Sequence, residues 1–305
     1  MTLEKFENNI WQWEGWNVSW NKYGINKTSE ISIVLIHGFG ACKEHWRHNQ
    51  KSLARSNSCY AIDLMGFGES SQPKARLKNE SQLEGEFCYC FDNWGNQIAD
   101  FCKEVVQTPV ILIGNSIGGV IALRASHLLQ ENCLNVVLID CAQRTMDDKR
   151  LNEQPTWIQI LRPLIKNLVS QRWLSNNLFR NAANANVIKK VLKQAYPSGK
   201  NIDPELINLL LKPSLREGAS ESFRGFINLF NDYLATELLI DLEIPIDLIW
   251  GEKDPWEPIE VAKQWEKDFK CIRSLAVIQG AGHCPHDEAP EVVNPLLLNI
   301  IQHAT

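Results

Sequence analysis

Short apolar runs separated by helical patterns constrain this chain more than any other feature of its 305 residues. Nearly continuous apolar runs are typical of strands buried on both faces of a sheet, and strands that alternate with helices pair in parallel through right-handed crossovers. The sequence therefore predicts an α/β fold with a mostly parallel central sheet. Strands are expected over residues 17–23, at the sheet edge, and over 31–36, 59–64, 110–113, 135–139, 246–250 and 274–279.

The rhythm of strands and helices is interrupted in the middle of the chain. Helical spacing of apolar residues predicts helices over residues 43–55, 92–106, 117–129, 258–269 and 290–302. From residue 144 to 235 only helical patches occur. We therefore expect a core built from residues 1–142 and 241–305, with a helical cap formed by residues 143–240.

Composition narrows the class of protein. Apolar residues make up 44% and charged residues 22%, as in ordinary globular domains. A net charge of -5 disfavours nucleic acid as a partner.

No apolar run approaches the roughly 20 residues that span a bilayer, so we expect no integral membrane segment. The N-terminal MTLEKFENNI lacks the apolar stretch of a signal peptide. Nine cysteines without a repeated C-x2-C pair fit a reduced, cytoplasmic chain. Peripheral membrane contact stays open, although no amphipathic anchor is evident, and the oligomeric state is not indicated.

A candidate nucleophile follows the predicted strand 110–113. The residues Gly114-Asn115-Ser116-Ile117-Gly118 have the spacing G-x-S-x-G between a strand and a helix. A nucleophilic serine needs an exposed hydroxyl in a tight turn, and the flanking glycines permit that turn and close helix packing. We interpret Ser116 as the nucleophile. The alternative is a glycine-rich turn with a passive serine.

A second turn can supply part of an oxyanion hole. His37-Gly38-Phe39-Gly40 follows the predicted strand 31–36. We expect the backbone N–H groups of Phe39 and Ile117 to bind the oxyanion, where losing one donor typically costs about 2.7–4 kcal/mol. His37 is interpreted as a structural hydrogen-bonding residue of this loop.

The last two predicted strands end near a carboxylate and an imidazole. A serine nucleophile needs a base, and the base needs a carboxylate that orients it. Asp254 and His283 are placed for these roles, and the chain order Ser, Asp, His is the one known for this kind of architecture. Asp140 is the competing carboxylate, with Glu252 a weaker one. Neither a metal ion nor an organic cofactor is required.

Taken together, the motifs HGFG, DLMGFGES, GNSIGG, GEKDPW and GAGH, in that order, resemble the α/β-hydrolase superfamily over nearly the whole chain. The resemblance implies Ser116, Asp254 and His283 as the triad and an inserted cap. Epoxide hydrolases and haloalkane dehalogenases of this fold carry aspartate at the position of Ser116, which argues against both. Within this superfamily the chain resembles the pheophytinase and chlorophyll-dephytylase branch, whose members hydrolyse a phytyl ester. The resemblance rests on the segments IWQWEGWNVSW, HGFGACKEHWRHN, DPWEP and GHCPHDEAPE.

The sequence thus predicts a serine hydrolase that cleaves an apolar ester through an acyl-enzyme. Two alternatives remain: hydrolysis of a C–C bond in a vinylogous diketone, and ligand binding without catalysis. The C–C alternative requires cations that bind a carboxylate, for which Arg162, Arg172 and Arg180 are candidates. Most aromatic residues of the cap are expected to form its core. Aromatic candidates for an apolar pocket are Trp157, Trp173, Phe179, Phe223, Phe226, Phe230 and Tyr233.

Overall fold

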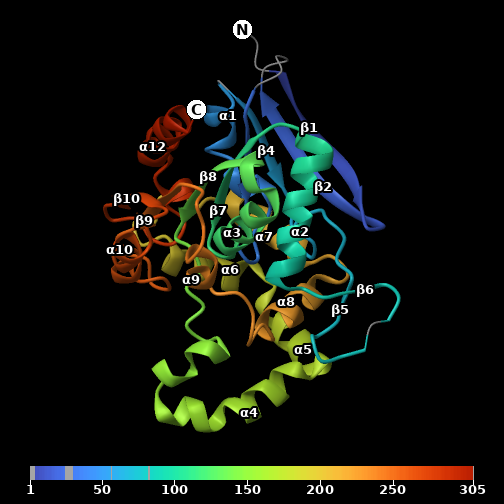
Figure 1. Cartoon of the computed structure of the whole chain (residues 1–305). Helices are drawn as coiled ribbons and strands as arrows, with labels where there is room; N and C mark the ends of the chain where they lie inside the picture. Colours follow the sequence, from blue (N-terminus) through green and yellow to red (C-terminus); the bar gives the residue numbers. More distant parts are fainter. Residues whose placement is uncertain (1–3, 25–29, 56, 82, 305) are drawn as a thin grey trace.

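The computed structural model describes residues 4–24, 30–55, 57–81 and 83–304, and its centre is a sheet of eight strands (Figure 1). The strand order is β1-β2-β4-β3-β7-β8-β9-β10, and all pairs from β4 to β10 are parallel. The predicted α/β fold is therefore confirmed. The strands are β1 (Glu4–Trp13), β2 (Trp16–Gly24), β3 (Ser32–Ile36), β4 (Ser58–Ile62), β7 (Val110–Asn115), β8 (Cys133–Ile139), β9 (Ile246–Gly251) and β10 (Ile272–Ile278).

The edge strand differs from the prediction. Residues 17–23 do form a strand, but β2 lies between β1 and β4 and pairs antiparallel with both. The edge belongs to β1, which joins β2 through Glu14 and Gly15, both with positive φ as a tight hairpin requires. The many polar residues of β1 hid it from pattern analysis. The first three residues of the MTLEKFENNI segment lie outside the described residues.

Helices cover both faces of the sheet. The helices α2 (Phe91–Phe101), α3 (Ile117–Leu129) and α12 (Pro290–His303) lie close to their predicted ranges, as does α10 (Ile259–Asp268). The helix predicted over 43–55 is wrong, because only a 3-10 turn (Lys43–Trp46) and the short α1 (Gln50–Leu53) form there. The N–H and the ammonium group of Lys43 both bond to the buried carboxylate of Asp63, which draws the start of this segment inward.

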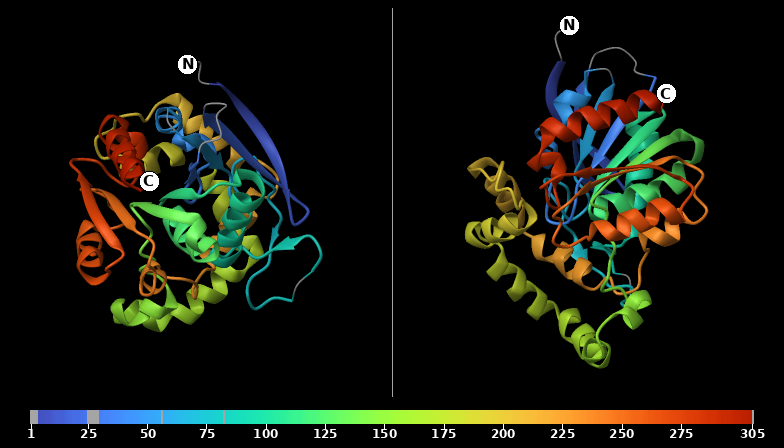
Figure 2. Two further views of the ribbon diagram at one scale, coloured as in Figure 1. Left: turned by 45° about the horizontal axis from the view of Figure 1, so that its top comes forward. Right: turned by 90° about the vertical axis from the view of Figure 1, so that its left-hand side faces the viewer.

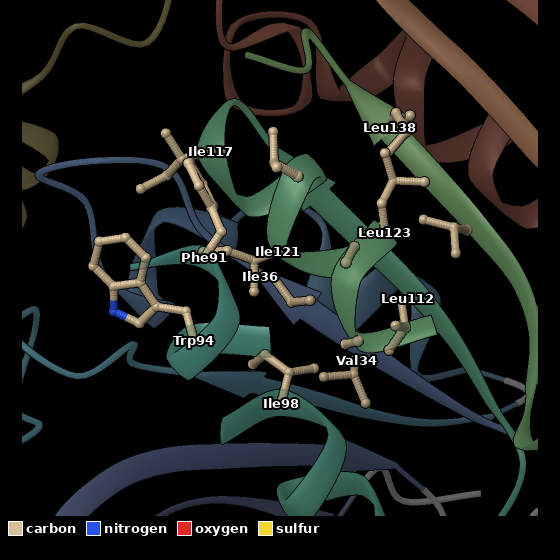
Figure 3. Close-up of a cluster of buried hydrophobic side chains, with 14 of the residues drawn as sticks. Val34, Ile36, Phe91, Trp94, Ile98, Leu112, Ile117, Ile121, Leu123 and Leu138 are labelled. Atoms are coloured by element: carbon tan, nitrogen blue, oxygen red, sulfur yellow. The ribbon is translucent and has the colours of Figure 1, made fainter. Parts of the chain in front are cut away.

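The core lies between the sheet and these helices. On one face, side chains of α2 and α3 interlock with those of β3, β7 and β8 (Figure 3). On the other face, α12 and α1 pack against the same central strands. Ile117 contributes its side chain to the first core, so the start of α3 is fixed where β7 ends. The labelled residues of the first core are Val34, Ile36, Phe91, Trp94, Ile98, Leu112, Ile117, Ile121, Leu123 and Leu138.

A helical insertion, residues 140–245, separates β8 from β9. All of these residues are described, and they contain no strand. Figure 2 shows α4 and α5 standing away from the sheet. None of the helices in the described part of the chain is long and apolar enough to cross a membrane. The insertion contains α4 (Thr156–Ser170), α5 (Arg172–Ala182), α6 (Ala185–Ala195), α7 (Pro204–Ser214), α8 (Ala219–Ile227) and α9 (Ala235–Leu239).

Candidate active site

Ser116 occupies a strained turn between β7 and α3. Its φ of 56° and ψ of -123° are rare for a residue with a side chain and cost about 1–3 kcal/mol. Close packing maintains the turn: a Cβ atom on Gly114 would lie 2.2 Å from the carbonyl oxygen of Gly118. A Cβ atom on Gly118 would lie 2.4 Å from the carbonyl oxygen of Ile36. Both positions therefore require glycine, and the serine side chain is left partly exposed.

The loop after β3 passes directly beside this serine. A Cβ atom on Gly38 would lie 3.2 Å from the Cβ atom of Ser116, so a larger residue would press against the serine. Phe39 follows, and Ile117 begins α3, where backbone N–H groups lack intrahelical acceptors. Within the described part of the chain, neither the N–H of Phe39 nor that of Ile117 donates a hydrogen bond. Two free donors therefore lie on either side of the serine.

His37 uses both ring nitrogens to hold the loop. Nδ1 lies 2.7 Å from the carbonyl oxygen of Gly38, and the N–H of Leu64 donates to Nε2 at 3.1 Å. Burial lowers the pKa of His37 to about 4, so the ring is neutral, with its proton on Nδ1. This arrangement agrees with the structural role expected for His37.

Asp254 and His283 meet beyond the carboxyl ends of β9 and β10. The Nδ1 of His283 donates to Oδ2 of Asp254 at 2.7 Å. The other carboxylate oxygen accepts the backbone N–H groups of Trp256 at 2.8 Å and Glu257 at 3.1 Å. Burial acts to raise the pKa of Asp254, but the hydrogen bond and charge of His283 outweigh it, and the pKa is lowered. The carboxylate is therefore ionised and oriented at neutral pH.

Asn115 links this pair to the serine turn. Its side-chain N–H₂ donates to the carbonyl oxygens of His283 at 3.0 Å and Ile139 at 3.1 Å. The loop that carries the imidazole is thereby attached to the residue before Ser116. No hydrogen bond among the described residues joins the Ser116 hydroxyl to His283. Because Nδ1 is engaged by Asp254, Nε2 is the nitrogen left for the serine.

Asp140, the rival carboxylate, lies behind the pair. It is fully buried with a φ of 43°, and its Oδ1 accepts the N–H of Gly251 at 2.9 Å. Its Oδ2 has no N–H donor within the described residues. Burial, followed by the nearby charge and hydrogen bond of Asp254, raises the pKa of Asp140 well above its ordinary value. Asp140 is therefore a neutral acid whose O–H faces the Asp254 carboxylate.

Asp140, Asp254 and His283 are residue types that can bind a metal ion. One ligand atom each of Asp140, Asp254 and His283 lies within 4.8 Å of the others, the one such group among the described residues. The set fits a cation poorly, because Asp254 and His283 bond to each other and Asp140 is held protonated. Glu252 is exposed and accepts the N–H of Gly280, away from the imidazole.

An apolar cavity of about 60 Å³ adjoins Phe39. The ring of Phe39 stacks on that of Phe226 in α8, with 4.0 Å between the ring centroids. The ring centroids of Phe179 in α5 and Phe223 in α8 lie 5.5 Å apart. The cavity therefore lies between the expected oxyanion loop and the helical insertion. Phe67, Leu210 and Pro213 also line this cavity and were not predicted as pocket residues. Of the three, only Phe67 lies within a motif noted in the sequence, DLMGFGES.

The other aromatic candidates lie elsewhere. Phe230 contacts the guanidinium of Arg162, and Tyr233 contacts that of Arg124. Trp157 and Trp173 are exposed, so neither belongs to a packed core.

The candidate carboxylate-binding cations are largely engaged. Arg162 bonds to Asp148, and Arg172 bonds to Glu221. Arg180 alone of the three has no ion pair within the described residues.

Comparison with known proteins places this geometry in context. A sequence model of the family described as alpha/beta hydrolase fold matches residues 31–290. The chain is 25% identical to chloroplastic pheophytinase of Arabidopsis thaliana over 94% of its own length, but it spans only 64% of that protein. It is 29% identical to the (lyso)-N-acylphosphatidylethanolamine lipase of Mus musculus, with 88% of this chain and 78% of the lipase covered. The solved epoxide hydrolase CorEH has a TM-score of 0.79 at 15% identity, covering 99% of this chain and all of the other.

Proposed function

This chain belongs to the alpha/beta hydrolase fold family, and we propose that it is a serine hydrolase that cleaves a carboxylic ester of an apolar substrate. The observation that carries the proposal is the 2.7 Å contact between His283 and Asp254, linked through Asn115 to the strained turn of Ser116. The structural likeness to an epoxide hydrolase concerns the fold, whereas the residue at the turn is serine.

The mechanism follows from the positions of donors and acceptors. Nε2 of His283 takes the hydroxyl proton of Ser116 as its oxygen attacks the ester carbonyl carbon. The N–H groups of Phe39 and Ile117 bind the resulting oxyanion. Collapse of the tetrahedral adduct breaks the bond to the alcohol, which leaves with the proton from His283. Water then repeats the sequence on the acyl-serine and releases the acid. Asp254 keeps the imidazole in the required tautomer throughout.

The apolar nature of the substrate is supported by the cavity and by the relatives. The cavity beside Phe39 is lined mainly by apolar and aromatic side chains, which suits an apolar group rather than a polar one. At about 60 Å³ it would hold only part of an acyl or isoprenoid chain. Pheophytinase and a phospholipid-type lipase are the named relatives. A phytyl-type or other hydrophobic ester is therefore our proposed substrate class, with residues 143–240 acting as the cap that selects it.

The C–C hydrolase alternative is weakened by the ion pairs of the insertion. Arg162 and Arg172 would have to give up their ion pairs with Asp148 and Glu221 before binding a substrate carboxylate.

The nine cysteines are all unpaired, which supports the proposal of a reducing, cytoplasmic location.

The test is labelling and turnover at Ser116. A fluorophosphonate should label the wild-type chain, and Ser116→Ala should abolish both labelling and hydrolysis of a p-nitrophenyl ester without changing the circular dichroism spectrum. Ser126→Ala is the matched control, because its hydroxyl lies on the same helix and, among the residues that the structure describes, bonds only to the carbonyl oxygen of Leu123. It should keep both activities. Labelling that survives in Ser116→Ala, or a wild type that never labels, contradicts the proposal.

A further inference from the structure

The helix α4 presents an apolar face to solvent. Residues 157, 160, 161, 164 and 168 recur at helical spacing and so share one side of the helix. All five are large and apolar, and between 42% and 72% of each is exposed. Trp173, at the start of α5, is 64% exposed. We call this surface the α4 face; it consists of Trp157, Ile160, Leu161, Leu164, Leu168 and Trp173.

The opposite side of α4 attaches the helix to the rest of the insertion, and it does so through cations. The guanidinium of Arg162 lies 4.4 Å from the ring of Phe230, and its Nε donates to Asp148 at 3.0 Å. Lys166 contacts the same ring and the same carboxylate. A surface helix normally turns its apolar side inward. Here the inward side combines Arg162 and Lys166 with the partly buried Ile158, Ile165 and Val169, while the larger apolar residues face outward. The expectation that the aromatic residues of the cap form its core is therefore wrong for Trp157 and Trp173.

The stretch of chain that contains the α4 face carries only positive formal charges, although Arg162 and Lys166 pair with Asp148, and Arg172 pairs with Glu221. Residues 154–202 contain eight Lys and Arg and no Asp or Glu, so all 36 acidic residues of the chain lie elsewhere, against 23 of the 31 basic ones. Four of the eight are exposed and have no ion pair within the described residues: Arg180, Lys189, Lys190 and Lys193. The remainder of the chain carries a net charge of -13 while this stretch carries +8.

From this pattern we infer that the α4 face docks on the surface of an anionic lipid bilayer. Large exposed apolar patches mark interaction sites, and exposed Trp and Leu combined with free Lys and Arg suit the lipid interface. Here the free cations follow the α4 face along the chain, with Arg180 on α5 and three lysines on α6. In Figure 1 the helix forms the edge of the molecule opposite the two chain ends, where a planar surface can reach it. A second copy of the chain fits less well, because pairing two α4 faces would bring two positive stretches together.

The site and the face are joined through α5. Phe179 lines the apolar cavity, while Leu178, the preceding residue, is 48% exposed. A bilayer on the α4 face would therefore lie against a helix that also forms the cavity wall. This inference is independent of the proposed catalysis, because docking requires only the surface.

The experiment is sedimentation with sucrose-loaded vesicles, using Ser116→Ala so that turnover cannot alter the lipid. Vesicles of equal phosphatidylcholine and phosphatidylglycerol should bind the chain, phosphatidylcholine alone should bind it at least several-fold less, and added salt should weaken binding. Ile160→Glu combined with Leu164→Glu should lower partitioning by roughly 100-fold, because each withdrawn side chain is worth a factor of about 10. Val292→Glu is the control, since Val292 is 46% exposed on α12.

Separate outcomes would overturn the inference. Equal sedimentation of the double variant and the control removes the α4 face as the lipid-binding surface. Equal binding to both kinds of vesicle removes the anionic lipid as the feature that is recognised. A dimer that dissociates in the double variant, with no vesicle binding by the parent chain, assigns the face to a second copy. A raised KM for a water-soluble ester in the double variant of the catalytically intact chain, with vesicle binding unchanged, assigns it to substrate entry. Thermal unfolding of each variant verifies that exposed positions leave the fold intact.

Discussion

Replacing Asp254 with asparagine tests the catalytic proposal most sharply, because the structure determines how the new side chain must sit. One carboxylate oxygen accepts two backbone N–H groups, from Trp256 and Glu257. In Asp254→Asn only the amide oxygen can remain there, so the amide N–H₂ must face the imidazole of His283. Nδ1 of that ring then has to accept a hydrogen bond.

This reversal determines the size of the effect. When Nδ1 accepts, the proton of the neutral imidazole lies on Nε2, which can no longer take the proton of Ser116. In a serine protease the equivalent change lowers kcat by about 10⁴, corresponding to about 5.5 kcal/mol of transition-state free energy. We expect a loss of that order here, with KM for a p-nitrophenyl ester changing much less.

The matched variant is Asp140→Asn. Asp140 is already neutral because burial raises its pKa, so asparagine keeps a neutral N–H donor beside Asp254 and a carbonyl oxygen for the N–H of Gly251. We expect kcat to fall by less than about tenfold. Steady-state kinetics at pH 8, with thermal unfolding of both variants, measures the contrast. The reverse order, a large loss in Asp140→Asn and a small one in Asp254→Asn, would refute the assignment of the acid.

Two further predictions concern neighbouring groups. Burial raises the pKa of Glu257 to about 8, so the native state holds a proton that the unfolded chain releases near pH 4.5. The stability that this proton contributes is complete below pH 4.5 and is lost as the pH rises to about 8. Glu257→Gln should therefore remove this loss and raise the unfolding free energy at pH 9 by up to about 5 kcal/mol in urea titrations; an unchanged pH profile contradicts the assignment. Gly118→Ala would place a Cβ atom 2.4 Å from the carbonyl oxygen of Ile36 and 2.7 Å from that of His37, displacing the loop that carries Phe39. Its kcat/KM should fall about 10²–10³-fold, as for a lost oxyanion donor, and near-normal turnover by a stably folded variant would contradict that role.

Much of the core could be predicted because its signals are local. Parallel strands buried on both faces produce continuous apolar runs, and α3 begins at Ile117 as its pattern indicated. The turn at Ser116 was also readable, because Gly114 and Gly118 satisfy a steric demand within a few residues. The strand β1 was missed, since a polar edge strand lacks such a run.

What the sequence by itself determined was the order of the buried parallel strands and of the helices that cover them, the serine turn and the positive stretch, because each depends on neighbours along the chain. Only the tertiary structure decided which carboxylate reaches His283. Asp140 and Asp254 both follow buried strands. They differ in how deeply each carboxyl group is buried and in which hydrogen bonds it makes, and both differences depend on how β8, β9 and β10 pack together. The outward turn of the α4 face was equally a tertiary decision. Helical periodicity defines an apolar side but does not say whether protein covers it, and here Phe230 and Asp148 hold the other side.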